Sequence, residues 1–231
     1  MPDSSPPLPS IRARIGEACA AAGRHPDAVT LLAVSKTRSA ADIAALADQG
    51  QRDFGENYLQ EALEKMPALA HRALIWHFIG PIQSNKTRDI AGHFDWVHSV
   101  DRARVARRLN EQRPDALAPL NVCIQVNVDE ETTKGGVPLA RVEELAAAFR
   151  GWPRLRLRGL MAIPRANAAD HNRAAFRRLA MTLSHLRHTM PALDTLSMGM
   201  SADFPAAIEE GATLVRLGTA LFGPRPPHAR A

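Results

Sequence analysis

The strongest constraint on the fold is a regular alternation of short apolar segments with segments of helical periodicity. Eight apolar segments predict strands, at residues 29–37, 52–57, 74–80, 96–100, 120–128, 155–163, 195–200 and 213–223. Eight strands that alternate with helices in one pass predict an α/β fold, a single parallel (β/α)8 barrel of the TIM type. A doubly wound open sheet is the alternative, because periodicity cannot show closure, but no GxGxxG motif follows the first strand.

The barrel pattern occupies nearly the whole chain. Residues 1–10 form a leader rich in Pro and Ser, which we expect to be flexible, and residues 11–23 have helical periodicity and end on a glycine, as helices often do. We therefore expect an extra N-terminal helix within a barrel domain that covers residues 11–223, followed by a short tail over residues 224–231. No interdomain linker is evident, so we expect one domain.

The charge of the chain does not favour a nucleic-acid-binding protein. The net charge is +5, but 29 Lys and Arg residues stand against 24 Asp and Glu residues and are spread among them. The richest basic cluster, residues 102–108, has the spacing of a solvated helix face. Aromatic residues, which stack on bases, make up only 5% of the chain. We expect no nucleic-acid partner.

Other features indicate a cytoplasmic protein. No apolar run approaches the roughly 18 residues of a membrane helix, and the N-terminus lacks the basic and apolar regions of a secretory signal. Cys19 and Cys123 lie far apart in the sequence, as expected of reduced thiols. His185 and His188 lie one helical turn apart, but no third ligand is evident, so we expect no metal site. We expect a monomer.

Lys36 stands at the end of the first predicted strand, where a lysine is unusual. Lysine is among the residues that are least often buried without a partner. The chain contains only four lysines, Lys36, Lys65, Lys86 and Lys134, and otherwise uses arginine for positive charge. Guanidinium cannot lose a proton to act as a nucleophile, whereas an amine can. The position of Lys36 therefore suggests that an amine is required there.

The last two strand ends suggest a phosphate site opposite this amine. In a barrel of this type, the loops after strands seven and eight often bind phosphate. Here they contribute Ser201, which we expect to cap the next helix, and Gly218 with Thr219. An amine that faces a phosphate site fits a phosphorylated aldehyde held by lysine, and pyridoxal 5′-phosphate (PLP) has both groups. A Schiff-base aldolase fits equally well on this reasoning.

Seven stretches in order make the chain resemble the pyridoxal phosphate homeostasis proteins, which are similar to the N-terminal barrel of alanine racemase. The likeness runs from about residue 11 to 223 and rests on LLAVSKT, FGENYLQEALEK, WHFIGPIQSNK, VHSVD, QVNVDEETTKGG, GLMAI and LSMGMSADFPAAIEEGATLVRLGTALFG. The resemblance implies that PLP is the cofactor and that Lys36 is its Schiff-base lysine. It implies that Ser201, Gly218 and Thr219 hold the phosphate. Asn57 and His77 would line the ring pocket, and Arg216 would face the pyridine nitrogen.

The resemblance also bears on activity. A cation such as Arg216 beside the pyridine nitrogen disfavours ring protonation and weakens the cofactor as an electron sink. Alanine racemases add a tyrosine from a second domain, whereas Tyr58, the one tyrosine here, begins a predicted helix. We expect a PLP carrier or reservoir without evident turnover, with apo PLP-dependent enzymes as recipients. The alternative is a racemase-like enzyme of low activity. Lys134 is either a second amine for the cofactor or an ordinary loop lysine.

Overall fold

The computed structural model describes residues 8–130, 135–164 and 169–224, and its strands form a closed parallel barrel. The strand order β4-β3-β2-β1-β9-β8-β7-β5 closes through a pairing between β4 and β5. This closure confirms the barrel and excludes the open sheet. The barrel strands are β1 Thr30–Val34, β2 Asp53–Glu56, β3 Ile75–Phe78, β4 Trp96–Val100, β5 Leu120–Asn127, β7 Leu155–Met161, β8 Thr195–Ser197 and β9 Leu214–Leu217. A two-residue strand, β6 (Val137–Pro138), pairs with the end of β5.

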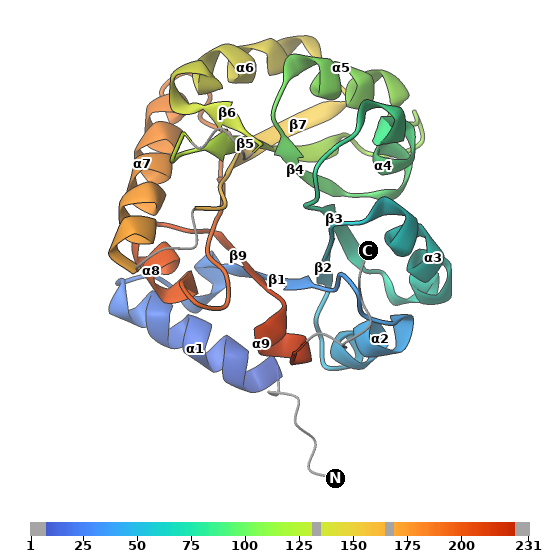
Figure 1. The fold of residues 1–231 in the computed structure, drawn as a ribbon, viewed down its shortest axis with the longest axis vertical. Coiled ribbons are helices and arrows are strands. Elements are labelled where there is room, and N and C mark those ends of the chain that lie inside the picture. Colours follow the sequence, from blue (N-terminus) through green and yellow to red (C-terminus); the bar gives the residue numbers. More distant parts are fainter. Residues whose placement is uncertain (1–7, 131–134, 165–168, 225–231) are drawn as a thin grey trace.

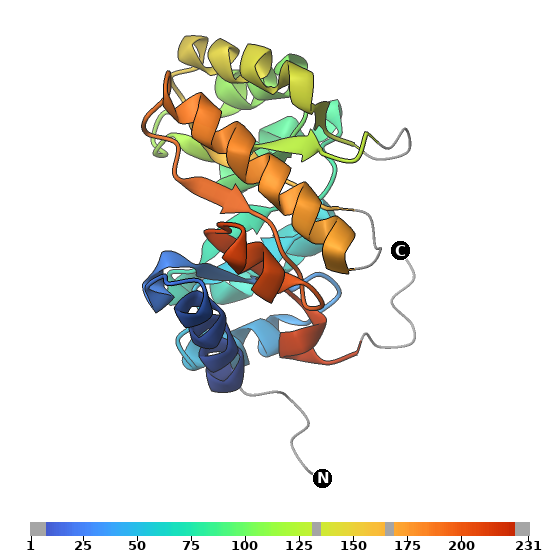
Figure 2. The ribbon, with the colours of Figure 1, turned by 90° about the vertical axis from the view of Figure 1, so that its left-hand side faces the viewer.

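The helices surround the ring of strands (Figure 1). They are α1 Leu8–Ala21, α2 Ala40–Asp48, α3 Leu59–Leu69, α4 Thr87–His93, α5 Ala103–Gln112, α6 Val142–Ala148, α7 Ala169–Arg187, α8 Phe204–Glu209 and α9 Thr219–Phe222. Figure 2 shows α7 running obliquely across the outside of the barrel, with α1 beside α8. None of these helices has the length and apolar character needed to cross a membrane.

Helix α1 begins earlier than the sequence pattern predicts. It starts at Leu8, inside the segment expected to be a flexible leader, and the side chain of Leu8 is almost completely buried. Leu8 joins Ile11 and Ile15 in one apolar stripe at helical spacing, and burial of this stripe accounts for the added turn. By contrast, α2 begins at a local signal, because Ser39 caps it in a capping box with Asp42.

The parallel strands bring their carboxyl ends to one rim of the barrel. Residues that directly follow β1, β2, β8 and β9 therefore meet there, although they lie far apart in the sequence. Between the strands and helices lies a continuous apolar core that includes Phe54, Phe94 and Phe176. The barrel interior is different, because four buried polar side chains point into it: His77, His98, Ser197 and Arg216.

Candidate functional site

A pocket of about 330 Å³ opens at the carboxyl rim of the barrel. It brings together six of the seven residues expected at the site, from β1, β2, β8 and β9: Lys36, Asn57, Ser201, Arg216, Gly218 and Thr219. Its apolar lining comes from Val34, Ile79, Ile163, Met200 and Ala202. The combination of an amine, an amide, two hydroxyls and an apolar wall is typical of a pocket for a small organic ligand with polar groups.

The loop at Gly218 runs close to the backbone of β1 and leads directly into α9. A Cβ on Gly218 would lie 3.3 Å from the carbonyl oxygen of Val34, so a side chain here would crowd the backbone of β1. Gly218 is the N-cap residue of α9, and the first N–H groups of a helix have no acceptor within the helix. These N–H groups, next to the Thr219 hydroxyl, suit an anion.

The sequence suggested that Ser201 caps α8, but in the structure it does not. The helix begins at Phe204 with Asp203 as its N-cap residue. The carboxylate of Asp203 instead shapes the loop, because it accepts hydrogen bonds from the Met200 N–H at 2.7 Å and from the Asn172 side chain at 2.7 Å. Ser201 therefore lines the pocket in a loop held by Asp203, and its hydroxyl is not used as a helix cap.

Asn57 carries a polar atom that fits a bound group. Its side-chain oxygen Oδ1 is buried, and it has no hydrogen-bond partner among the residues that the structure describes. A buried acceptor without a donor is costly, and native proteins rarely tolerate one unless a ligand or water supplies the donor. Because Asn57 lines the pocket, this unused acceptor lies beside the space that a polar ligand would fill.

Arg216 lies at the inner end of the pocket and is almost completely buried. Its guanidinium donates to the carbonyl and hydroxyl oxygens of Ser197 at 2.6 and 2.8 Å, and to the carbonyl oxygen of Ala162 at 2.8 Å. Burial lowers the pKa of Arg216 to about 10, which still leaves the group cationic at neutral pH. These three bonds fix a positive charge at the inner end of the pocket.

His77, expected in the same pocket, is not brought there by the structure. It lies in β3 opposite Gly55 and Trp96, and its ring points into the barrel interior. Its Nε2 lies 3.0 Å from Asp53 Oδ1. His77 lines a different cavity, which the first residues of several strands form at the opposite end of the barrel. The register of β3 therefore places His77 too far inside the barrel to reach the Lys36 pocket.

A chain of hydrogen bonds connects His77 to Arg216 across the barrel interior. His77 Nδ1 lies 2.9 Å from His98 Nε2, and His98 Nδ1 lies 2.8 Å from the hydroxyl oxygen of Ser197. Arg216 can only donate and the carboxylate of Asp53 can only accept, so Ser197 accepts from Arg216 and Asp53 accepts from His77 Nε2. A neutral His77 then accepts at Nδ1 from His98 Nε2, and a neutral His98 accepts at Nδ1 from the Ser197 hydroxyl.

The pKa values of His77 and His98 are both lowered, which favours the neutral form of each ring at neutral pH. Burial, followed by the nearby His77 and Arg216, holds the pKa of His98 well below its ordinary value. Burial likewise lowers the pKa of His77, although Asp53 and Asp95 oppose it. Sequence reasoning missed Asp53, His98 and Ser197; the available signal was that His77 and His98 interrupt otherwise apolar strands.

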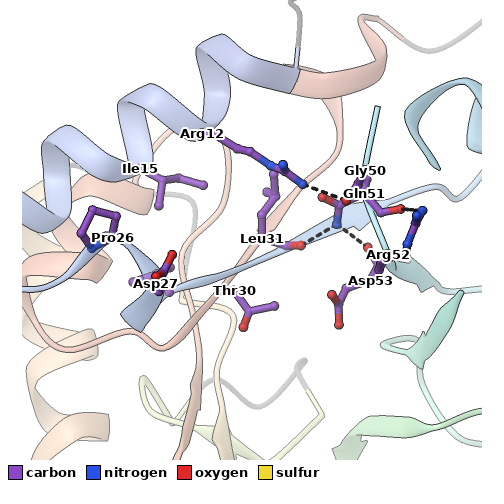
Figure 3. Close-up of a pocket in the computed structure, with 11 residues that line it drawn as sticks. Arg12, Ile15, Pro26, Asp27, Thr30, Leu31, Gly50, Gln51, Arg52 and Asp53 are labelled. Carbon is purple, nitrogen blue, oxygen red and sulfur yellow. Dashed lines mark hydrogen bonds between the residues drawn. The ribbon is translucent and has the colours of Figure 1, made fainter. Parts of the chain in front are cut away.

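A larger cavity, about 390 Å³, lies at the amino-terminal end of the barrel between α1, β1 and β2 (Figure 3). Its two arginines bind backbone carbonyls: Arg12 donates to Gly50 and Arg52 to Ala47. These bonds tie α1 and β2 to the end of α2. The cavity shares Thr30 and Asp53 with the smaller cavity next to His77, and it contains no residue expected at the site.

Comparison with known proteins assigns the family. The family model for the alanine racemase N-terminal domain matches residues 8–226. The chain is 59% identical to the pyridoxal phosphate homeostasis protein of Pseudomonas aeruginosa over 221 residues, which are 94% of each chain. It is 51% identical to the protein of that name from Escherichia coli K12, over 97% of this chain and 98% of the other. The chain belongs to the pyridoxal phosphate homeostasis protein family.

A solved structure supports the same assignment. The structure of PipY from Synechococcus elongatus PCC7942 with PLP bound is 37% identical and has a TM-score of 0.79. The match covers 90% of this chain and all of PipY. PLP is bound in that structure of PipY.

Tyr58 and Lys134 were also considered from the sequence. Tyr58 is the N-cap residue of α3 and is 44% exposed, and it is not among the residues that line the Lys36 pocket. Lys134, considered as a second amine, lies outside the described residues.

Cys19 and Cys123 are both buried and unpaired. Burial raises the pKa of Cys123 to about 12, so its thiol is unreactive.

Proposed function

We propose that this chain is a carrier and reservoir of PLP and takes part in the homeostasis of this cofactor, with Lys36 as the attachment point. One observation carries the proposal: Lys36 shares a single pocket with the buried, unpartnered oxygen of Asn57 and with the loops that bear Ser201 and Gly218. The names of the relatives from P. aeruginosa and E. coli, and PLP in the structure of PipY, support it.

Each group in the pocket has a role that suits its chemistry. When bound, PLP supplies an aldehyde that condenses with an amine and a phosphate that carries negative charge. The Lys36 amine would hold the aldehyde carbon. The hydroxyls of Ser201 and Thr219, with the N–H groups at the start of α9, would hold the phosphate. Arg216, fixed on Ser197 and Ala162, would present its positive charge to the ring nitrogen.

A carrier fits the pocket better than a racemase. Racemisation needs an acid–base group on each side of the reacting carbon. Lys36 can serve one side, but Tyr58, the one tyrosine of the chain, is exposed at the start of α3. We propose that the protein acts as a monomer in the cytoplasm, where buried, unpaired cysteines stay reduced. Its recipients are apo forms of PLP-dependent enzymes.

Transfer of the cofactor tests this function. Protein loaded with PLP and freed of excess ligand is mixed with an apo PLP-dependent enzyme, and recovery of the activity of that enzyme is followed. The proposal predicts full recovery with wild-type protein and little recovery with Lys36→Ala treated in the same way. A wild-type protein that takes up no PLP, or that never yields it to an apo-enzyme, contradicts the proposal.

A further inference from the structure

A buried ionic cluster, formed by Lys65, Glu56 and Glu61, lies next to the backbone around Lys36. None of its three residues lines the pocket. Lys65 Nζ lies 2.8 Å from Glu56 Oε1 and 2.7 Å from Glu61 Oε1. The side chains of Lys65 and Glu56 are 8% and 0% exposed, so both charges are withdrawn from water. Removing charges from water is costly, and a hydrophobic pair would often stabilise a fold as well. Such a cluster calls for an explanation other than stability.

The cluster binds the backbone on both sides of Lys36. Lys65 Nζ donates to the carbonyl oxygen of Ser35 at 3.1 Å, and the N–H of Thr37 donates to Glu61 Oε1 at 2.5 Å. The hydroxyl of Ser35 also donates to Glu56 Oε1, at 2.6 Å. The residues before and after Lys36 are therefore both tied to the pair formed by Lys65 and Glu61 on α3.

The backbone at Thr37 needs such support. Thr37 has a φ of 64°, a left-handed conformation that is unfavourable for a β-branched residue. Backbone strain of this kind persists only where the surroundings hold it, and it is concentrated at functional sites. The carboxylate of Glu61 accepts from the N–H of Thr37 itself, so it stabilises the turn that sends the Lys36 side chain from the end of β1 into the pocket.

We propose that Glu61 and Lys65 are positioning residues for Lys36: they hold the turn at Ser35–Thr37 so that the amine meets the aldehyde of PLP. This inference rests on the proposed function. It assigns the two residues no contact with the phosphate or the ring. Losing them should therefore weaken capture of the aldehyde and leave recognition of the rest of the cofactor intact.

Two ligands separate these effects. PLP has the aldehyde, whereas pyridoxine 5′-phosphate has the same ring and phosphate with an alcohol in its place. The affinity of both is measured for wild type, Glu61→Ala and Glu61→Gln. Glu64→Ala, an exposed acidic residue on the same helix, is the matched control. Thermal unfolding of each variant shows that it is folded.

We expect Glu61→Ala to weaken PLP by about tenfold, the effect of one lost bond to a charged group, and to leave pyridoxine 5′-phosphate within about twofold. Glu61→Gln should restore most of the PLP affinity, because its amide oxygen can still accept from Thr37. Glu64→Ala should match wild type with both ligands. If Glu61→Ala does not fold, Glu61→Asp, whose shorter side chain cannot reach Thr37, replaces it with the same expected result.

If Glu61→Ala lowers the affinity for both ligands equally, or for neither, Glu61 does not position Lys36 and this inference is overturned. The proposed function still stands in that case, provided that the wild-type protein binds PLP. A wild-type protein that binds neither ligand overturns the proposed function and this inference with it. Borohydride reduction adds an independent readout, because Glu61→Ala should lower the fraction of chains that carry covalently fixed cofactor at a subsaturating concentration of PLP.

Discussion

Arg216 donates to Ser197 at two atoms, the carbonyl oxygen at 2.6 Å and the hydroxyl oxygen at 2.8 Å. The carboxylate of Asp53 can only accept, so the neutral rings of His77 and His98 each donate toward it, and the Ser197 hydroxyl donates its proton to His98. A cation at the inner end of the Lys36 pocket and a carboxylate at the other end of the barrel are thus joined through two neutral histidines.

The neutral histidines predict a loss of stability in acid. The pKa values of His77 and His98 are lower in the folded protein than the ordinary value of 6.5. Below that pH the unfolded chain binds more protons than the folded one, so the free energy of unfolding falls by up to about 1.4 kcal/mol per pH unit for each histidine. Above it, the two histidines cause no such dependence.

Urea unfolding of wild type and His98→Gln between about pH 5 and pH 7.5 measures this loss. The glutamine amide can still accept from Ser197 and donate to His77, but it binds no proton. We expect the stability of the variant to fall less steeply in acid than that of wild type. Parallel curves for the two proteins would show that His98 is not held neutral by the fold.

The phosphate assignment predicts a selective effect of Ser201→Ala. Loss of a hydrogen bond to a charged group costs roughly 1.5–3 kcal/mol, so the affinity for PLP should fall about tenfold or more. Pyridoxal, which lacks the phosphate, should bind both proteins equally. Titration of the absorption band of each ligand measures the affinities. If pyridoxal weakens as much as PLP does, Ser201 does not contact the phosphate.

The arrangement of Lys36 and Tyr58 predicts negligible racemisation. Tyr58 is exposed at the start of α3, so it does not supply the second acid–base group that inversion requires. Purified protein loaded with PLP, incubated with L-alanine and analysed by chiral chromatography should form almost no D-alanine. Turnover at about 1–10³ s⁻¹, the usual range of enzymes, would reject the carrier and favour a racemase.

Much of the fold and part of the site could be predicted from the sequence, for one physical reason. In a parallel barrel the residues after each strand meet at one rim, so Lys36, Asn57, Ser201 and Gly218 could be placed together once the strands were found. A local sequence pattern does not determine the register of a strand. His77 lies near the end of β3, yet its ring is inside the barrel and bonds to Asp53.

The ionic cluster was missed for a related reason. Lys65 occupies the buried stripe of α3, between Ala62 and Leu69 at helical spacing, so its burial could have been inferred. Its contacts could not, because they join α3 to the ends of β1 and β2 and depend on how these elements pack. Likewise, the start of α1 at Leu8 depends on burial against the barrel and not on a local signal.

The role of Lys36 is tested most directly by locating the lysine that carries the cofactor. Purified protein is saturated with PLP, reduced with borohydride, digested and mapped by mass spectrometry, with Lys36→Ala treated in parallel. We predict that the modification lies on Lys36 and that the variant, still folded, loses most of it. Modification of Lys134, Lys65 or Lys86 with Lys36 left unmodified, or full modification of the Lys36→Ala variant, would contradict the assignment.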